Sequence, residues 1–419
     1  MRIALWASVT VIAYAYIGYP LLIWALARWA GKRSAAAPVS PAVSILLCVR
    51  NGMTHLPQKM AHLFSLDYPG IEEIIVVSDG SSDGAAEYLA TLTDPRLKIF
   101  VLKEHGGKAA ALNVAMQAAT AETLLFVDIR PRIAPGAIQS LMNHFADPRV
   151  GCVSGELVLL QGEHNAIPAA VGGLYWRYEQ WIRKSEARFD SPVGVYGGFY
   201  AIRRALAVPQ PAGIILDDMF EPLAVIRQGY RSVIEPEARV YDEWPGKTHA
   251  EFKRKVRTLA GNFQLVRMAP WILTRENRVV FQLVSHKILR LFVPYLLLLA
   301  FAATLLLAPG SRFYAVFAGL QLLGLLLAAI SAWVRIPVVD RIGSPIAALL
   351  VLNAAAVVGF YRFLATREAL WKIWDPAAPP GRQESDAGAA TQQDFSASSG
   401  WIQSTSGVIS RHATKGDIQ

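Results

Sequence analysis

The sequence predicts an α/β domain with a mostly parallel sheet, flanked on both sides by membrane helices. Short apolar runs that end at small polar residues recur between residues 43 and 160, as is typical of strands buried on both faces of a sheet. Helical stretches separate these runs, which is the order of βαβ units. The hydrophobic fraction of the 419 residues is 53% and the charged fraction is 17%, a composition that indicates membrane spans.

The first predicted element is a membrane anchor at residues 3 to 27, which contain no charged side chain and are long enough to cross a bilayer. We interpret it as a retained anchor, because the apolar region of a cleaved signal peptide is shorter. Arg28, Lys32 and Arg33 follow directly and place the downstream side in the cytoplasm.

The α/β domain is expected to follow a short linker and to contain five strands in chain order. These are Val43–Val49, Glu73–Val77, Leu97–Leu102, Thr123–Val127 and Val150–Leu160. An alanine-rich helix that begins at Gly106-Gly107-Lys108 and runs to Ala119 separates the third strand from the fourth. The only cysteines, Cys48 and Cys152, lie in strand-like runs and are predicted core residues without a disulfide framework.

The carboxyl-terminal part changes character after residue 276. Residues 279 to 290 are amphipathic and carry His286, Lys287 and Arg290, which predicts a helix on the membrane surface. Apolar runs follow at about 291–308, 313–333 and 345–365. The predicted organisation is an anchor at 1–37, the α/β domain at 38–275, the surface helix at 276–290, membrane helices at 291–374 and a disordered tail at 375–419.

The number of true spans stays open at this point. An anchor, a cytoplasmic domain and three further spans would place the carboxyl tail outside the cell. Arg362, Arg367 and Lys372 instead favour an inside location for that end. One apolar run is therefore expected to be re-entrant or interfacial, and the sequence does not decide which.

The stretch around Asp79 is the first that indicates chemistry. Ile74 to Val77 are four consecutive β-branched residues, and Ser78 to Gly84 then form a turn of small acceptors and glycines. In an open α/β sheet, ligands bind at the carboxyl ends of the strands. Asp79 is placed there to accept hydrogen bonds from a ribose hydroxyl or a base N–H, and the alternative is a capped turn without a ligand.

Five motifs together resemble the membrane-bound family 2 glycosyltransferases, which include cellulose, hyaluronan and poly-N-acetylglucosamine synthases. They are Val77–Asp83, Gly107–Asn113, Phe126–Asp128, Leu216–Asp218 and Arg254–Asn262. The resemblance covers roughly residues 40 to 275. It implies a GT-A-type, Rossmann-like domain that binds a nucleotide sugar, and it assigns Asp79 to the base or ribose of the donor.

The resemblance also implies residues for the donor diphosphate and for a divalent cation, Mg²⁺ or Mn²⁺. Lys108 lies at a helix start, where backbone N–H groups and an ammonium suit a phosphate. Asp128 resembles the first aspartate of the Asp-x-Asp signature, which holds the metal. Arg130 stands in the third position, so either other groups help Asp128 to hold the metal or Arg130 itself supplies positive charge. His105 and His249 are candidate additional ligands.

The Asp217-Asp218 pair resembles the catalytic acidic pair of the family. Adjacent carboxylates repel each other, so such a pair needs a counter-ion or a proton. The resemblance makes Asp218 the general base and Asp217 its support, and an acid pair at a helix start is the alternative. Gly197 and Gly198 belong to a glycine-rich segment that lets the backbone approach a sugar.

Two further assignments have strong alternatives. Glu156, after a buried strand, is either an acceptor-side residue or a surface charge. Lys253 to Arg257 crowd one helical turn, so they favour an anionic ligand or an anionic lipid surface. Where the family has Gln-x-x-Arg-Trp, this chain has Arg254 and Thr258 around Arg257, and we assign Arg254 and Arg257 to the diphosphate. The tryptophan helps polymerising relatives to hold the acceptor sugar, so its replacement argues against processive synthesis.

The resemblance therefore implies inverting transfer of a hexose or hexosamine from a UDP- or GDP-linked donor to a lipid-linked or glycan acceptor. The expected setting is exopolysaccharide or envelope glycan synthesis at the inner membrane, with a multi-pass chain, a cytoplasmic catalytic domain and no nucleic acid partner. The net charge of +9 is expected to face lipid headgroups or phosphates. The alternatives are a processive polysaccharide synthase and a non-catalytic scaffold. A transporter is disfavoured because Arg362 is nearly the only ionisable residue in the spans.

Overall fold

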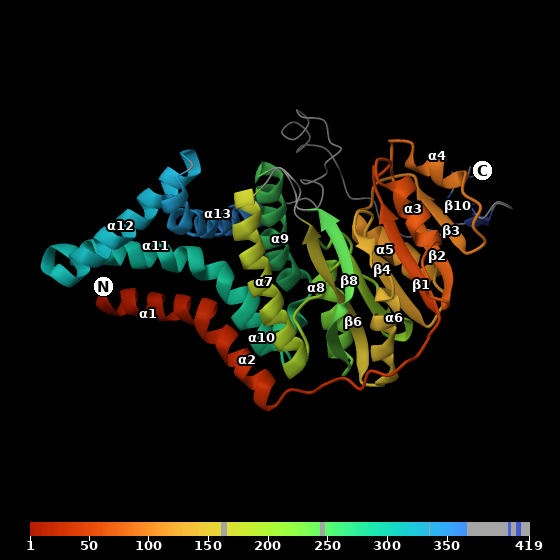
Figure 1. Ribbon diagram of the computed structural model, residues 1–419, viewed down its shortest axis with the longest axis horizontal. Helices are drawn as coiled ribbons and strands as arrows, with labels where there is room; N and C mark the ends of the chain where they lie inside the picture. Colours follow the sequence, from red (N-terminus) through yellow and green to blue (C-terminus); the bar gives the residue numbers. More distant parts are fainter. Residues whose placement is uncertain (161–165, 244–247, 335, 367–400, 404–407, 412–419) are drawn as a thin grey trace, which may run out of the picture. The chain divides into compact units, whose positions relative to one another are not determined.

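The computed structural model describes residues 1–160, 166–243, 248–334, 336–366, 401–403 and 408–411, and its elements are drawn in Figure 1. Its internal contacts divide the chain into two units. We call Met1–Arg33, Leu159–Val193 and Glu243–Thr366 the helical unit. The sheet unit comprises Ser34–Val158, Gly194–Asp242 and the part of the chain after Thr366.

The sheet unit is built on one ten-stranded sheet with the order β5-β8-β6-β7-β4-β1-β2-β3-β10-β9. Its strands are β1 Val43–Val49, β2 Ile71–Asp79, β3 Leu97–Leu102, β4 Thr123–Val127, β5 Arg132–Ile133, β6 Val150–Leu160, β7 Phe199–Arg203, β8 Arg231–Glu243, β9 Trp401–Gln403 and β10 Val408–Arg411. The five predicted strands are all present, and β2 is longer than predicted at both ends.

The centre of the sheet is parallel and brings the ends of three strands together. Strand β1 pairs in parallel with β2 and β4, so that Leu47 lies opposite both Val76 and Val127. Strand β7 is antiparallel to β4, and β6 is antiparallel to β7. The sheet is therefore mixed. The sequence did not indicate β7 as a strand, because the glycine-rich turn that leads into it dominated the pattern.

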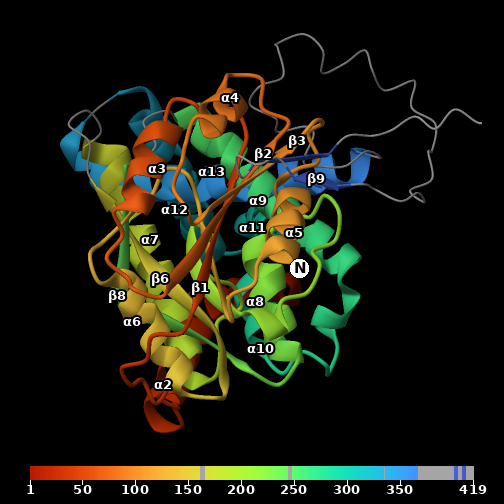
Figure 2. The ribbon, with the colours of Figure 1, turned by 90° about the vertical axis from the view of Figure 1, so that its right-hand side faces the viewer.

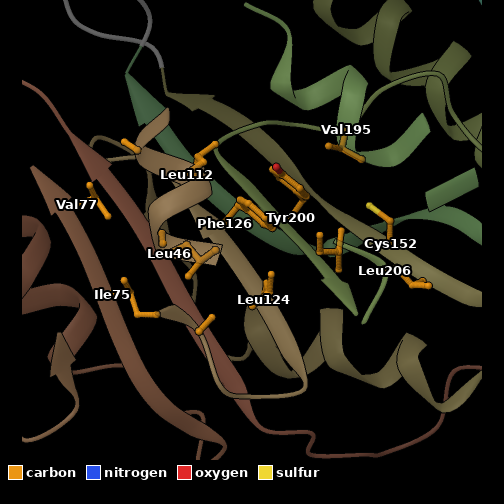
Figure 3. Close-up of a cluster of buried hydrophobic side chains, with 14 of the residues drawn as sticks. Leu46, Ile75, Val77, Leu112, Leu124, Phe126, Cys152, Val195, Tyr200 and Leu206 are labelled. Carbon is orange, nitrogen blue, oxygen red and sulfur yellow. The ribbon is translucent and has the colours of Figure 1, made fainter. Parts of the chain in front are cut away.

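Helices cover both faces of the sheet, and α3 and α5 lie on opposite sides of β1 and β2 (Figure 2). The helices of this unit are α3 Leu56–Phe64, α4 Ala85–Ala90, α5 Lys108–Ala118, α6 Ala137–Met142 and α8 Asp217–Arg227. One core cluster joins the sheet to α5 and α8, and in it Phe126 stacks on Tyr200 with ring centroids 4.4 Å apart (Figure 3). Cys152 is buried in this core as predicted, and Cys48 is half-buried beside it.

Among its described residues, the helical unit contains four helical stretches that are long and apolar enough to cross a membrane: Arg2–Trp29, Val280–Gly310, Arg312–Ser331 and Val339–Ala365. Its helices are α1 Arg2–Ala13, α2 Tyr19–Trp29, α7 Ala166–Phe189, α9 Thr248–Met268, α10 Val280–Leu283, α11 Leu289–Leu307, α12 Arg312–Trp333 and α13 Pro337–Ala365. Within this unit α1 runs beside α11, and α9 packs on α13 (Figure 1).

The segment that the sequence predicted as a surface helix before residue 291 is continuous with the helix that follows it. A π-helical turn, Val284–Ile288, joins α10 to α11 into one long helix. Its basic side chains contact carboxylates of α7: His286 Nδ1 lies 2.8 Å from Glu186 Oε1, and Lys287 Nζ lies 3.1 Å from Glu179 Oε2. The polar face of this segment therefore packs on helix α7, more than 90 residues earlier in the same chain.

Two short strands, β9 and β10, lie within the segment 375–419 that was predicted as a tail. Strand β10 pairs in parallel with β3, with Val408 opposite Ile99, and antiparallel with β9. The remaining residues of 375–419 lie outside the described part of the chain.

The buried carboxylate of Glu73, near the start of β2, forms hydrogen bonds to three other segments of the sheet unit. Glu73 is 2% exposed, and it accepts hydrogen bonds from the hydroxyl of Ser44, from Thr120 N at 2.6 Å and from the ammonium of Lys98. Burial alone would raise the pKa of Glu73, but these donors outweigh burial and lower it to about 2. Glu73 therefore stays ionised in the folded protein.

We predict that Glu73→Gln lowers the free energy of unfolding by about 2 kcal/mol at pH 7, because charge-assisted hydrogen bonds are lost. The folded-state pKa is below the unfolded value, so the contribution is present above about pH 4.5 and is lost as the pH falls towards 2. Thermal unfolding in detergent at several pH values measures the difference. The exposed neighbour Glu72→Gln is the matched control, and equal behaviour of the two variants would contradict this role of Glu73.

Candidate active site

The carboxylate of Asp79, the last residue of β2, accepts hydrogen bonds from the turn that precedes α5. Asp79 Oδ1 accepts from Gly106 N at 2.8 Å, and Oδ2 accepts from Gly107 N at 2.9 Å. The ring Nδ1 of His105 lies 2.7 Å from the same Oδ2, and the Asp79 side chain is 4% exposed. These contacts match the turn without a ligand that the sequence analysis gave as the alternative, and the assignment of Asp79 to the ribose or base of the donor stays a prediction.

Two glycines allow this turn to approach the end of β2. Gly80 has a φ of +60°, and a Cβ at this position would lie 2.6 Å from His105 N. Gly107 has a φ of +88° and immediately precedes α5. Residues other than glycine disfavour such φ values. The two glycines therefore fix the residue at which α5 begins, which is Lys108.

Lys108 bridges two of the predicted carboxylates. Its Nζ lies 3.2 Å from Asp128 Oδ1, at the end of β4, and 3.0 Å from Asp217 Oδ2, at the start of α8. Burial alone would lower the pKa of Lys108, but Asp128, Asp217 and Asp218 raise it above its ordinary value. Lys108 is therefore the counter-ion that the acidic pair needs, and it remains charged.

Backbone groups of the glycine-rich segment contact both Asp218 and Asp128. A Cβ on Gly197 would lie 2.9 Å from Asp218 Cβ, so the aspartate packs directly against the glycine backbone. Val195 N donates to Asp218 O at 2.9 Å, and Asp128 N donates to Gly198 O at 3.1 Å. The positions of both aspartates therefore depend on the backbone from 195 to 198.

The other predicted residues have separate surroundings. Arg130 NH2 lies 3.0 Å from Asp242 Oδ2 of β8. Glu156 is half-buried in β6. Arg254 and Arg257 belong to α9 of the helical unit, and their assignment to the diphosphate stays a prediction. The side chain of His249 lies outside the described residues, and His105 bonds to Asp79 as stated above.

The residues around Lys108 fit a hard divalent cation by charge. The ammonium of Lys108 contacts two carboxylates, and the charge of Asp218 also acts on it, so negative charge is in excess. Carboxylate oxygens are the ligands that Mg²⁺ and Mn²⁺ take. Within the described residues, no three His, Cys, Asp or Glu side chains gather as a complete metal site. A metal at Asp128 would therefore share its coordination with groups of the ligand.

Sequence reasoning missed a buried network behind the acidic pair. Glu221, one helical turn after Asp217, is fully buried, and Gln210 Nε2 donates to its Oε1 at 3.0 Å. Asn113 of α5 binds the backbone of Gln210 through Nδ2 at 2.9 Å and Oδ1 at 2.8 Å. Burial raises the pKa of Glu221 to about 8. The signal in the sequence was the spacing of four residues from Asp217, which places both acids on one helix face.

Two family models match the chain. The model of "Glycosyl transferase family 2" matches residues 44–208, and that of "Glycosyl transferase family group 2" matches residues 127–352. The second match covers more than half of the chain. Together, the fold and these matches define a glycosyltransferase with a GT-A-like fold. The chain belongs to glycosyl transferase family 2, as the sequence motifs predicted.

Individual proteins are similar over part of the chain. An N-acetylglucosaminyltransferase of Bradyrhizobium diazoefficiens is 24% identical over 247 residues, which are 55% of this chain and 50% of the relative. A poly-beta-1,6-N-acetyl-D-glucosamine synthase of Staphylococcus aureus is 24% identical over 229 residues, which are 54% of this chain and 55% of the relative. The chain spans about half the length of these curated relatives.

One solved structure shares the fold over most of the chain. The mannosyltransferase PcManGT from Pyrobaculum calidifontis, in complex with GDP-Man and Mn²⁺, superimposes with a TM-score of 0.64 at 21% identity. The match covers 86% of this chain and 99% of that chain. At this level of identity the likeness supports the fold alone.

We predict that Gly197→Ala lowers turnover by roughly 10–100-fold, because the new methyl group displaces Asp218, the candidate base, and a displacement of a catalytic group costs about this much. Release of nucleoside diphosphate measures turnover, and the unfolding temperature shows that the variant is folded. Gly310→Ala is the matched control, since nothing lies within 4 Å of that position. Full turnover of Gly197→Ala would show that the contact with Asp218 is unimportant.

We predict that the stability difference between wild type and Glu221→Gln depends on pH. The folded state keeps a proton that unfolded Glu221 releases above about pH 4.5, so wild-type stability falls as the pH rises to about 8. Glutamine is always neutral and can still accept from Gln210, so it removes this loss, which is roughly 3–5 kcal/mol by linkage. Denaturant unfolding between pH 4.5 and 8 measures the difference, with exposed Glu87→Gln as the control. Parallel pH curves for wild type and Glu221→Gln would contradict a buried neutral acid.

Proposed function

We propose that this glycosyltransferase moves a hexose or hexosamine from a nucleotide-diphosphate sugar to an acceptor hydroxyl, with inversion at the anomeric carbon. The observation that carries the proposal is the arrangement of Asp218 against Gly197, next to the ion pairs of Lys108 with Asp128 and Asp217. This arrangement combines a candidate base with groups suited to an anionic leaving group.

In this proposal Asp218 is the general base. A carboxylate oxygen of Asp218 takes the proton of the acceptor hydroxyl while that oxygen attacks the anomeric carbon. The bond between this carbon and the diphosphate oxygen breaks, and its electron pair leaves with the nucleoside diphosphate. A direct displacement of this kind needs one base and no enzyme nucleophile, and it inverts the anomeric centre.

Lys108 has the second role. Its ammonium, which Asp128 and Asp217 keep charged, can exchange one of these carboxylates for a phosphate oxygen of the donor. A Mg²⁺ or Mn²⁺ ion at Asp128 would supply further positive charge to the departing diphosphate. Asp79 stabilises the backbone turn that sets the position of Lys108, and in this way it supports donor binding.

The membrane helices and the relatives support the choice of substrates. The four apolar helices support a multi-pass protein of the inner membrane with a cytoplasmic catalytic domain and a lipid-linked or glycan acceptor. The two similar proteins named for N-acetylglucosamine make UDP-N-acetylglucosamine the first donor to test, with GDP-linked sugars as the comparison. The resulting setting is exopolysaccharide or envelope glycan synthesis.

A processive polysaccharide synthase is the second candidate, because one similar protein is named as a synthase of poly-beta-1,6-N-acetyl-D-glucosamine. Thr258 at the place of the tryptophan of polymerising relatives favours transfer of single sugars. The length distribution of the product distinguishes the two candidates.

We predict that membranes containing the wild-type chain transfer sugar from at least one donor in a panel of UDP- and GDP-linked hexoses and hexosamines. Asp218→Asn is expected to lower this transfer by about 10²–10⁴-fold, since an amide cannot accept the proton. Incorporation of radiolabelled sugar into lipid and glycan fractions measures it. Asp67→Asn, which changes an exposed aspartate of the same domain, is expected to retain wild-type transfer.

The same assay separates the parts of the proposal. Chelation of divalent cations is expected to abolish transfer, and readdition of Mg²⁺ or Mn²⁺ to restore it. Unchanged transfer after chelation would remove the metal from the proposal, and full activity of Asp218→Asn would remove the base. No transfer from any donor would favour the non-catalytic scaffold.

A further inference from the structure

A pocket of about 290 Å³ lies within the sheet unit, between α3 and the chain segment that follows Asp128. Its volume is roughly that of ten water molecules, which is enough for a phosphate ester group. The ionisable side chains that line it are His55, Lys59, His62, Arg130 and Arg132. Among the described residues of the lining, none is acidic. The pocket lining also excludes Lys108 and the carboxylates of the candidate active site.

Lys59 is the buried cation of this pocket. Its residue is 4% exposed, and Nζ donates to Pro131 O at 2.7 Å. An ammonium has three N–H donors, so two remain for other acceptors. Burial lowers the pKa of Lys59 to about 8, although Asp128 and Asp242 act in the opposite direction. An anion in contact with the ammonium would offset the effect of burial.

His62 adds a neutral donor. Ile133 N donates to His62 Nε2 at 3.0 Å, so the ring carries its proton on Nδ1 when it is neutral. Burial lowers the pKa of His62, and the charges of Lys59 and Arg132 lower it further. His62 therefore offers an N–H without adding positive charge next to Lys59.

The two arginines supply charge at the exposed side of the pocket. Arg130 is half-exposed and contacts Asp242 Oδ2 through NH2 at 3.0 Å, and Arg132 is exposed. A guanidinium has five N–H donors in a planar fork that suits phosphate oxygens. Asp242, which pairs with Arg130 and also acts on Lys59, lies outside the lining. An anion inside the cavity would offset the remaining positive charge of Lys59 and Arg132.

We propose that this pocket binds a phosphate group, with Lys59 and His62 at its buried end and Arg132 at its exposed end. The site is additional to the donor site and does not depend on the proposed reaction. A soluble phosphate ester and an anionic lipid headgroup share the required chemistry. Since Lys59 and His62 also hold the backbone at Pro131 and Ile133, a bound phosphate would stabilise the segment that follows Asp128.

The test is a calorimetric titration of the full chain with inorganic phosphate, without divalent cation, in nanodiscs of zwitterionic lipid. Wild type is expected to bind phosphate with a Kd in the millimolar range or below. Arg132→Gln, which changes an exposed residue, and Lys59→Met are each expected to weaken binding about tenfold. Arg239→Gln, which changes an exposed arginine paired with Glu237, is expected to leave it unchanged.

A second arm replaces the lipid with one rich in phosphatidylglycerol. Loss of phosphate binding by wild type in these nanodiscs assigns the site to a lipid headgroup, and retention assigns it to a soluble phosphate. The proposal is overturned if wild type does not bind phosphate in zwitterionic nanodiscs. It is also overturned if Arg132→Gln and Lys59→Met bind as wild type does, or if Arg239→Gln weakens binding equally.

Discussion

Asp79 accepts two backbone N–H groups and contacts His105, and this interaction fixes where α5 begins. Hydrogen bonds from N–H groups to a buried carboxylate are among the stronger interactions in a protein. The first residue of α5 is Lys108, so the ion pairs of Lys108 with Asp128 and Asp217 depend on that turn. A substitution of Asp79 at the end of β2 would therefore displace Lys108 and weaken its ion pair with Asp217 of α8.

The two buried glutamates of the sheet unit show how the surrounding donors decide whether a carboxyl group is charged. Glu73 faces an ammonium, a hydroxyl and a backbone N–H, and its pKa is lowered to about 2. Glu221 has one amide donor, from Gln210, and Asp217 adds negative charge nearby, so its pKa is raised to about 8. Burial alone opposes charge at both positions. A neutral Glu221 lies behind the acidic pair without adding to its negative charge.

The sequence predicted the parallel centre of the sheet because β1, β2 and β4 are apolar runs that end at polar turns. It also indicated Asp79, Lys108, Asp128 and Asp217, which the structure places within one unit. It did not predict how they contact each other. A charged residue at a strand end looks the same in sequence whether it faces a ligand or a backbone turn, so the sequence left both interpretations of Asp79 open, and the structure shows its contacts with the turn. His286 and Lys287 were predicted to face lipid, because the carboxylates that they contact, Glu186 and Glu179, lie more than 90 residues away in the sequence.

The departure from the Asp-x-Asp signature has a structural explanation in the contacts of the segment after Asp128. Asp128 N donates to Gly198 O on one side, and α3 holds Pro131 O and Ile133 N on the other. Arg130, between these contacts, pairs with Asp242 of β8. The third position of the signature thus has an ion pair of its own, and Asp217 supplies a second carboxylate near Asp128 through Lys108. If Asp128 has the role that the resemblance implies, its nearest acidic partner is Asp217 at the start of α8, since Lys108 contacts both carboxylates.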